Sequence, residues 1–231
     1  MMDESNSLAR RNLVIIGDSA FAEIAHCYFS QGSKYSVVGF AVEQAFLKRG
    51  ELFGLPVVPF ESLKERFPPE TTDVYVAITY TQLNRLRARL CRAAKELGYA
   101  LASYVSPDAF VGPNVHLGEH CFIFENNVVQ PFVRIGDNVV LWSGNHIGHH
   151  STIGANVFVS SHVVISGYCE IGANTFLGVN STLANNLQIG KDCWIGPGVL
   201  LSKNTNDGEL YHTPAGEPAK VSALRFFKIR E

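Results

Sequence analysis

Aliphatic residues recur at every sixth position between Val105 and Asn206. The first residue of each six-residue block is Val, Ile or Leu in seventeen consecutive blocks, namely Val105, Val111, Leu117, Ile123, Val129, Ile135, Leu141, Ile147, Ile153, Val159, Ile165, Ile171, Leu177, Leu183, Ile189, Ile195 and Leu201. The fifth residue of most blocks is small or slender, as at Cys121, Ser151 and Val163. A period of six is typical of a parallel β-helix, in which each block forms a short strand and a turn. The pattern therefore predicts a left-handed β-helix of triangular coils, with the first and fifth positions facing the interior.

The turns of this coil are expected at the second position of each block and at a polar column that repeats once per coil. Gly occupies the second position in nine blocks, including Gly118 and Gly154, and glycine tolerates the positive φ that tight turns require. Short polar side chains suit turn conformations and can bond neighbouring backbone groups. The polar column consists of His120, Asn138, Asn156, Asn174 and Asp192.

Before the coil, strand-like apolar runs alternate with helical patterns. Strands are expected at Leu13–Gly17, Tyr35–Ala41, Leu55–Pro59 and Val74–Ile78, and helices at Ala20–Phe29, Phe60–Phe67 and Gln82–Leu97, the last ended by Gly98. This alternation predicts a small Rossmann-like α/β domain with a parallel sheet. The chain then divides into this domain at residues 1–104, a β-helix at 105–206, and a loop and tail at 207–231. We expect the apolar tail segment Val221–Ile229 to pack along the side of the prism.

The first turn of the α/β domain, Gly17–Ala22, holds only one glycine. A dinucleotide site needs several glycines so that backbone amides approach the phosphates, so redox use of a dinucleotide is not expected. Two interpretations stay open: Asp18 and Ser19 cap the following helix, or the turn lines a pocket for a modified nucleotide or sugar. The helix at Gln82–Leu97 carries five basic residues, for which a solvated face is favoured over a phosphate site: Arg85, Arg87, Arg89, Arg92 and Lys95.

Composition and charge narrow the class of protein. The chain has 231 residues, is 46% hydrophobic and has a formal net charge of −2, which does not indicate a nucleic-acid partner. No apolar run reaches the ~18 residues of a membrane span, and the N-terminal segment lacks the features of a signal peptide. Cys121, Cys169 and Cys193 fall at the inward fifth position, and no CxxC pair or disulfide framework is present. A cytoplasmic protein is expected.

Histidine and aromatic residues supply the candidate chemistry of the coil. Because other residues occupy the interior, six histidines are expected to point outward or into turns: His116, His120, His146, His149, His150 and His162. His149 is a candidate general base, since imidazole changes charge near neutral pH. Outward aromatic residues indicate a partner surface, and they are Phe132, Trp142, Phe158, Tyr168 and Phe176. Three prisms packed side by side would form a homotrimer with clefts between subunits.

A zinc ion held by three histidines at such an interface, as in the gamma-class carbonic anhydrases, is the alternative that these histidines raise. That class uses one histidine followed far downstream by a pair five residues apart. This spacing is not reproduced, and His116 has no partners at the right distances. We therefore expect no metal.

The segment around the candidate base resembles a known family. Ile147–Gly154 is similar to the His-acid-x-x-Ile-Gly segment of bacterial sugar acyltransferases, namely the sialic acid O-acetyltransferase-like proteins and the bacillosamine- and perosamine-type nucleotide-sugar N-acetyltransferases. The likeness covers nearly the whole chain and includes Leu55–Val57, Phe176–Ser181 and Gly216–Lys220. It implies the same order of domains, with the α/β domain first.

The resemblance implies transfer of an acyl group from acyl-CoA, most simply acetyl-CoA, to a sugar. His149 would be the base, and the backbone amide of Gly167 would meet the oxyanion. The N-terminal domain of that family holds a nucleotide-linked sugar, and the residues matched to the substrate are Ser19, Ala20, Phe21, Glu43, Thr79 and His150. Acyl-CoA lies between two prisms of a trimer, and the residues matched to it are Phe158, Gly167, Val179 and Pro197.

The chain departs from the family at several of these positions. His150 stands where an acid usually follows the base, Phe158 replaces a second histidine, and an acidic pair near the nucleotide base is reduced to Glu43. Three hypotheses follow. The first is an N-acetyltransferase for a nucleotide-linked amino-dideoxy sugar of surface polysaccharide, and the second is an O-acetyltransferase for a hydroxyl of a non-nucleotide or lipid-linked acceptor. The third is a non-catalytic trimeric β-helix that serves as a binding module.

Overall fold

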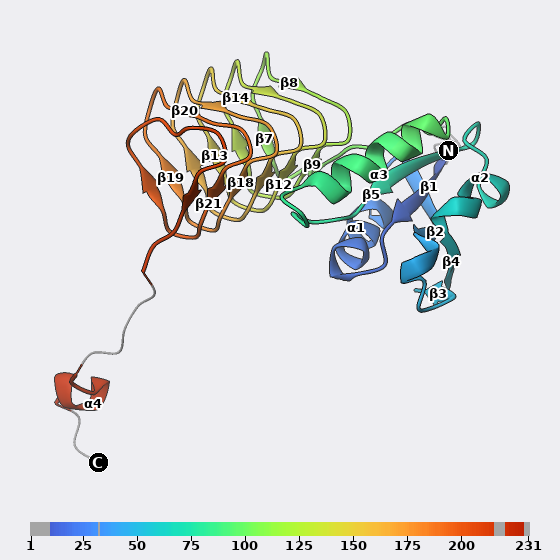
Figure 1. Ribbon diagram of the computed structural model, residues 1–231, viewed down its shortest axis with the longest axis horizontal. Coiled ribbons are helices and arrows are strands. Elements are labelled where there is room, and N and C mark those ends of the chain that lie inside the picture. Colours follow the sequence, from blue (N-terminus) through green and yellow to red (C-terminus); the bar gives the residue numbers. More distant parts are fainter. Residues whose placement is uncertain (1–9, 32, 215–219, 229–231) are drawn as a thin grey trace, which may run out of the picture.

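The N-terminal domain is a five-stranded sheet flanked by helices, in a computed structural model that describes residues 10–31, 33–214 and 220–228 (Figure 1). Its elements are β1 (Arg11–Ile16), α1 (Ala20–Ser30), β2 (Tyr35–Val42), η1 (Gln44–Phe46), β3 (Glu51–Leu52), β4 (Leu55–Pro59), η2 (Phe60–Ser62), α2 (Leu63–Arg66), β5 (Thr72–Val76) and α3 (Arg85–Glu96). The strand order is β3-β4-β2-β1-β5, and neighbouring strands are parallel except β3 and β4. The predicted parallel α/β domain is confirmed. The short β3 was not predicted, because a two-residue strand leaves no periodic signal.

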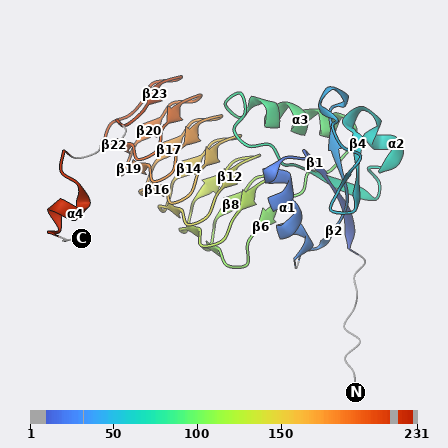
Figure 2. The ribbon, with the colours of Figure 1, turned by 90° about the horizontal axis from the view of Figure 1, so that it is seen from below.

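Two-residue strands then stack into the predicted β-helix (Figure 2). They are β6 (Tyr104–Val105), β7 (Phe110–Val111), β8 (His116–Leu117), β9 (Phe122–Ile123), β10 (Val128–Val129), β11 (Arg134–Ile135), β12 (Val140–Leu141), β13 (His146–Ile147), β14 (Thr152–Ile153), β15 (Phe158–Val159), β16 (Val164–Ile165), β17 (Glu170–Ile171), β18 (Phe176–Leu177), β19 (Thr182–Leu183), β20 (Gln188–Ile189), β21 (Trp194–Ile195), β22 (Leu200–Leu201) and β23 (Leu210–Tyr211). Sheet I holds β7, β10, β13, β16, β19 and β22; sheet II holds β8, β11, β14, β17 and β20; sheet III holds β6, β9, β12, β15, β18, β21 and β23. Strands pair with a register of eighteen residues, as Phe122 pairs with Val140. This register confirms the period of six.

The interior of the coil follows the predicted pattern, with one exception at its first coil. First- and fifth-position residues such as Val163 and Ile165 are fully buried. Val105 and Leu117 are 39% and 37% exposed, because the first coil has no coil beneath it. The prediction that every first-position aliphatic is core is therefore wrong at this end.

The turns contradict the expectation about where positive φ occurs. Positive φ falls at the fourth position of the block, for example at His120 (57°), Asn138 (57°) and Asn156 (63°). Histidine and asparagine tolerate this left-handed region better than branched residues do. Glycine is needed at the second position for a different reason: successive coils pack too closely there to leave room for a side chain. A Cβ on Gly136 or Gly154 would lie 2.8 Å from a backbone nitrogen of the next coil.

The N-terminal domain covers the outer face of sheet III. Phe122, Phe158 and Phe176 on this face are 0%, 2% and 5% exposed. They belong, together with the partly buried Trp142, to one apolar cluster with residues of α1, β2 and β5. The prediction that Trp142, Phe158 and Phe176 mark a partner surface is therefore wrong, because another part of the same chain covers them.

The end of the coil also differs from the prediction. β23 pairs with β21, with Trp194 opposite Leu210, so the coil continues past the expected boundary at residue 206. Beyond residues 215–219, which the structure does not describe, α4 (Ala223–Phe226) leaves Phe226 and Phe227 68% and 70% exposed (Figure 1). The described part of the tail thus does not pack along the prism. The matched segment Gly216–Lys220 lies mostly outside the described residues. None of the described helices is both long enough and apolar enough to cross a membrane.

Arg87 of α3 connects the two domains. Its side chain is completely buried, and its guanidinium donates to Asn138 Oδ1 at 2.8 Å and to the carbonyl oxygens of Asn138 and Asn156, both at 3.1 Å. It also donates to the Thr79 carbonyl oxygen at 2.7 Å. Burial lowers the pKa of Arg87 to about 10, so the group stays charged at neutral pH. The expectation of a solvated basic face is wrong at this position.

The polar column forms a ladder of side-chain hydrogen bonds along the coil. Asn138 donates to Asn156 at 2.8 Å, and Asn156 donates to Asn174 at 3.0 Å. Asn174 donates in turn to Asp192 at 2.9 Å. Arg85, the first residue of α3, pairs with Asp192 at 2.8 Å. The helix is therefore held to several successive coils through one column of turn residues.

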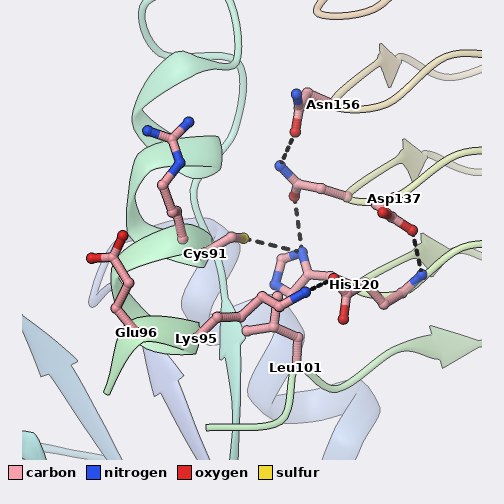
Figure 3. A pocket seen from close by; sticks show the side chains of 10 residues that line it. Cys91, Lys95, Glu96, Leu101, His120, Asp137 and Asn156 are labelled. Atoms are coloured by element: carbon pink, nitrogen blue, oxygen red, sulfur yellow. Dashed lines mark hydrogen bonds and ion pairs between the residues drawn. The ribbon is translucent and has the colours of Figure 1, made fainter. Parts of the chain in front are cut away.

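His120 begins this ladder and is buried beneath α3 (Figure 3). Its Nε2 accepts the Val76 N–H at 2.8 Å, so the ring proton lies on Nδ1, which donates to Asn138 Oδ1 at 2.9 Å. Cys91 Sγ lies 3.6 Å from the same Nδ1. The two residues do not form an activated thiol, because both imidazole nitrogens are engaged and burial raises the pKa of Cys91 to about 12.

Arg87→Met is expected to lower the free energy of unfolding by about 3 kcal/mol, because it leaves several buried carbonyl oxygens without donors. Urea unfolding at a fixed chain concentration measures this change. Arg92→Met on the same helix is the control, since Arg92 is exposed and its loss should change stability by about 0.5 kcal/mol or less. Equal urea midpoints for the two variants would contradict the role of Arg87.

The stability of the domain junction is expected to depend on pH through His120. Burial, with Arg87 nearby, lowers the pKa of His120 to about 3, whereas an unfolded histidine has a pKa of about 6.5. Between these values the unfolded chain binds a proton that the folded chain does not, so stability falls as pH falls, by about 2 kcal/mol from pH 7 to pH 5.

The comparison variant for this prediction is His120→Asn, which keeps a residue suited to positive φ. Urea unfolding at the two pH values should show a smaller loss for the variant than for the wild type. His26, whose pKa burial also lowers, contributes equally to both proteins and cancels in the difference. Identical pH dependence in the two proteins would show that His120 does not titrate in this range.

Candidate active site

A cavity of about 210 Å³ opens at the carboxyl ends of β1 and β2, the edge at which open α/β sheets bind ligands. The first turn, Gly17–Ser19, forms one wall, Glu43 after β2 forms another, and Leu86 and Leu90 of α3 close it. Both carboxylate oxygens of Glu43 accept hydrogen bonds from Arg89, at 2.9 and 2.8 Å. These bonds lower the pKa of Glu43, so the acid is ionised and already paired.

The residues matched to a nucleotide-sugar site are only partly brought together. Ser19 and Glu43 line the cavity. Ser19 stands at the N-cap position of α1, but its side chain makes no capping bond. Ala20 is exposed at the start of α1. The carbonyl oxygen of Thr79 accepts a hydrogen bond from Arg87. The side chain of Phe21 is 3% exposed within the core of the domain, so only the backbone of this position is open to a substrate, and its substrate role stays a prediction.

His149 lies at the corner between sheets I and II, in the turn from β13 to β14. Its imidazole covers Gly167 of the next coil, because a Cβ on Gly167 would lie 2.9 Å from Cε1 and 3.0 Å from Nε2. The backbone N–H of His149 donates to Gln130 Oε1 at 2.9 Å. The structure thus places the predicted base beside the residue predicted to meet the oxyanion.

His150 contacts the candidate base directly. The Nδ1 atoms of His149 and His150 are 3.1 Å apart, which is hydrogen-bond distance. The ring of His150 is stacked between Phe132, at a centroid distance of 4.7 Å, and Tyr168, at 4.9 Å. One Nδ1 must donate and the other accept. When His149 is the donor, its Nε2 is free to accept a proton.

The backbone N–H of Gly167 is already bonded. It donates to Oδ1 of Asn185 at 3.0 Å, and the carbonyl oxygen of Gly167 accepts the Asn186 N–H at 3.0 Å. The expectation that this amide is available to an oxyanion therefore does not hold while Asn185 keeps its position. Asn185 was not predicted from the sequence, although it lies eighteen residues after Gly167, in the same column of the coil.

The residues matched to acyl-CoA lie at three separate places. Gly167 lies beneath His149, whereas Val179 and Pro197 are exposed at the corner between sheets III and I. Phe158 lies on sheet III, where Tyr80 packs edge-on against it at a centroid distance of 5.3 Å. The N-terminal domain covers Phe158, which is 2% exposed, so the structure gives its assignment to acyl-CoA no support. A single chain does not bring His149 and Val179 to the same corner.

A larger cavity of about 450 Å³ lies between α3 and the turn that holds His120 (Figure 3). Charges of both signs line it, including Lys95, Glu96, Glu119 and Asp137. The imidazole of His120 offers this cavity no free nitrogen. In the part of the chain that the structure describes, no group of three or more His, Cys, Asp or Glu side chains is arranged to hold a metal ion.

Family models match the coil over most of its length. The bacterial transferase hexapeptide family (six repeats) matches residues 114–149 and 132–167. The hexapeptide repeat of succinyl-transferase matches residues 169–203. No curated protein sequence matches the chain.

Three solved structures share the arrangement of both domains. The acetyltransferase domain of PglB from Neisseria gonorrhoeae FA1090, also solved with acetyl coenzyme A, has a TM-score of 0.77 at 23% identity over 87% of this chain and 95% of that chain. PerB from Caulobacter crescentus, in complex with CoA and GDP-perosamine, has a TM-score of 0.76 at 26% identity over 89% and 95%. WeeI from Acinetobacter baumannii AYE has a TM-score of 0.68 at 18% identity over 86% and 94%. The coil therefore carries hexapeptide repeats like those of bacterial transferases, and the chain shares its two-domain fold with the acetyltransferase domain of PglB and with PerB.

Proposed function

We propose that this chain transfers an acetyl group from acetyl-CoA to the amine of a nucleotide-linked amino-dideoxy sugar for surface polysaccharide. The observation that carries the proposal is the His149 corner, where the imidazole covers Gly167, in an architecture shared with PerB, which was solved with CoA and GDP-perosamine. The cavity beside Ser19 and Glu43 offers a place for the acceptor in the N-terminal domain. The cytoplasmic location expected from the sequence stays a prediction.

A thioester is already activated, so the transfer needs a base and a hydrogen-bond donor for the oxyanion. The amine nitrogen attacks the thioester carbonyl carbon, and His149 Nε2 accepts the amine proton. The tetrahedral intermediate re-forms its carbonyl, the C–S bond breaks, and the imidazolium returns the proton to the CoA thiolate. His150, with its Nδ1 3.1 Å from that of His149, orients the imidazole in place of the acid found in the similar family.

The outer face of sheet I supports assembly as a homotrimer. Its outward residues include four exposed apolar side chains: Phe110 (56%), Val128 (37%), Val164 (37%) and Leu200 (70%). Sheet II presents polar residues at the matching positions, such as Arg134 and Glu170. An exposed apolar face indicates a contact between copies. Because sheet I lies between the His149 corner and the Val179 corner, this contact would bring corners of different chains together.

An O-acetyltransferase for a hydroxyl of a non-nucleotide or lipid-linked acceptor is the second candidate. Two features of the N-terminal domain favour it. Phe21 is buried, and both carboxylate oxygens of Glu43 are paired with Arg89, which reduces the groups available to a nucleotide. A non-catalytic binding module is the third candidate.

His149→Ala and His149→Asn are expected to lower kcat by about 10²- to 10⁴-fold, because the amine proton then has no acceptor. Release of free thiol from acetyl-CoA, measured with a panel of nucleotide-linked amino sugars, checks this. His116→Asn is the control, since His116 is exposed on sheet II and should retain the wild-type rate. All three variants should melt at the wild-type temperature, because the altered side chains are exposed.

The outcomes of this experiment separate the candidates. An active His149→Ala enzyme would remove His149 as the base. Thiol release with hydroxyl acceptors, but with none of the amino sugars, would favour the O-acetyltransferase. A chain that releases no thiol with either class, and gives no heat on titration with acetyl-CoA, would favour the binding module.

Leu200→Asp is expected to weaken the homotrimer, because a carboxylate on the apolar face of sheet I would lose its hydration in the contact. Sedimentation velocity should show a shift from trimer toward monomer. Gln188→Asp is the control, since Gln188 is exposed on sheet II. A monomeric wild-type chain, or a Leu200→Asp chain that stays fully trimeric, would contradict the role of sheet I.

A further inference from the structure

The hydrogen bonds of Gly167 limit which donor can meet a substrate oxygen at the His149 corner. Gly167 is buried, its N–H donates to Asn185 Oδ1, and its carbonyl oxygen accepts from Asn186. The ring of His149 covers the residue from the other side. A thioester oxygen would reach this N–H only by displacing the Asn185 side chain, which exchanges one hydrogen bond for another.

Asn185 is exposed at the same corner, one coil further along. Because its Oδ1 accepts from a backbone N–H at 3.0 Å, the orientation of the carboxamide is fixed, and Nδ2 carries its two donor hydrogens. Within residues 10–31, 33–214 and 220–228, Nδ2 has no hydrogen-bond partner. The bond from Gly167 also polarises the carboxamide, which strengthens Nδ2 as a donor.

Two comparable turns show what a purely structural cap looks like in this coil. Asp137 accepts the backbone N–H of Glu119 at 2.9 Å, and Asp207 accepts that of Lys191 at 3.0 Å. Both caps come from the following coil, as Asn185 does, and both are carboxylates, which accept hydrogen bonds but do not donate them. Of these three caps, the one that bonds Gly167 is the carboxamide. Asn204, which accepts the N–H of the strand residue Gln188 at 2.9 Å, is also a carboxamide but does not bond a turn residue.

We propose that the side-chain amide of Asn185, rather than the backbone N–H of Gly167, donates the hydrogen bond to the thioester oxygen; this role rests on the acetyl transfer proposed above. As the acceptor nitrogen attacks the carbonyl carbon, one electron pair of the C=O bond moves onto oxygen, where Asn185 Nδ2–H meets it. That pair re-forms the carbonyl as the C–S bond breaks, and the thiolate takes the proton that His149 removed from the acceptor. A donor fixed before the reaction stabilises the oxyanion without reorganisation. Gly167 then acts through Asn185, by holding the carboxamide in place.

Asn185→Asp and Asn185→Ala distinguish the two donors. Aspartate still accepts the Gly167 N–H but lacks the Nδ2 donor, whereas alanine removes the donor and also frees the Gly167 N–H. Both variants are expected to lower kcat by about 10²- to 10³-fold, with little change in KM for acetyl-CoA. Asp207→Ala is the matched control, because it removes a cap of the same kind at the corner between sheets II and III, and it should keep the wild-type kcat.

Three results would overturn the assignment of Asn185. An Asn185→Ala enzyme as fast as the wild type, or faster, would identify the Gly167 N–H as the donor. An Asn185→Asp enzyme with the wild-type kcat would show that a side chain which accepts the Gly167 N–H is sufficient for the full rate, without the Nδ2 donor. A loss of heat on acetyl-CoA titration, or of the melting transition, in step with the loss of rate would assign the residue to binding or folding. If the wild type releases no thiol with any acceptor, the proposed acetyl transfer is itself overturned. That result can be told apart from the three results above, each of which requires an active wild-type enzyme.

Discussion

The buried guanidinium of Arg87 sets how the two domains sit against each other. Removing such a charge from water is unfavourable unless its donors are all used, and here they bond Asn138, Asn156 and the Thr79 carbonyl oxygen. The turn column that supplies these acceptors repeats with the coil. Asn84, which directly precedes α3, also bonds this column, because its side chain donates to the Asn174 carbonyl oxygen at 2.9 Å.

The same helix also shapes the cavity beside Ser19 and Glu43. Leu86 and Leu90 of α3 line it, and Arg89 holds Glu43 through two hydrogen bonds. The residues that fasten α3 to the coil alternate along the helix with those that face the cavity. The cavity is consequently built on a helix that is hydrogen-bonded and ion-paired to the β-helix, so these contacts hold it in place relative to the coil.

The coil was predictable from the sequence because its core contains one aliphatic residue from every block of six. The resemblance to the acyltransferase family paired His149 with Gly167, and these residues meet because they are eighteen apart in a coil with that register. The second-position glycines were misread, because glycine permits both positive φ and close packing, and the letter alone does not separate the two. Arg87 was misread for a similar reason: a buried arginine differs from an exposed one only in its partners, and Asn138 and Asn156 lie far away in the chain.

The residue that precedes each core aliphatic differs in chemistry from one sheet to the next, and of this column only Phe158 and Phe176 were singled out in the sequence as outward aromatic residues. Along sheet III this column is mostly aromatic, with Val140 and Leu210 as the exceptions. Along sheet II it is polar, and along sheet I it is largely apolar and exposed. The aromatic face is the one that the N-terminal domain covers, whereas the apolar face of sheet I is left exposed in the single chain.

A triangular cross-section constrains how the acceptor could meet the base. The N-terminal domain covers sheet III, and the corner that holds His149, between sheets I and II, lies opposite that face. An acceptor bound beside Ser19 and Glu43 is therefore separated from His149 of its own chain by the width of the prism. Val179 and Pro197, at the corner where sheets III and I meet, lie nearer to the N-terminal domain. If sheet I of one chain packs against another copy, the His149 corner of the second chain can approach the acceptor cavity of the first. The apolar face of sheet I and the separation of the two halves of the site thus favour the same arrangement, in which each active site is shared between two chains.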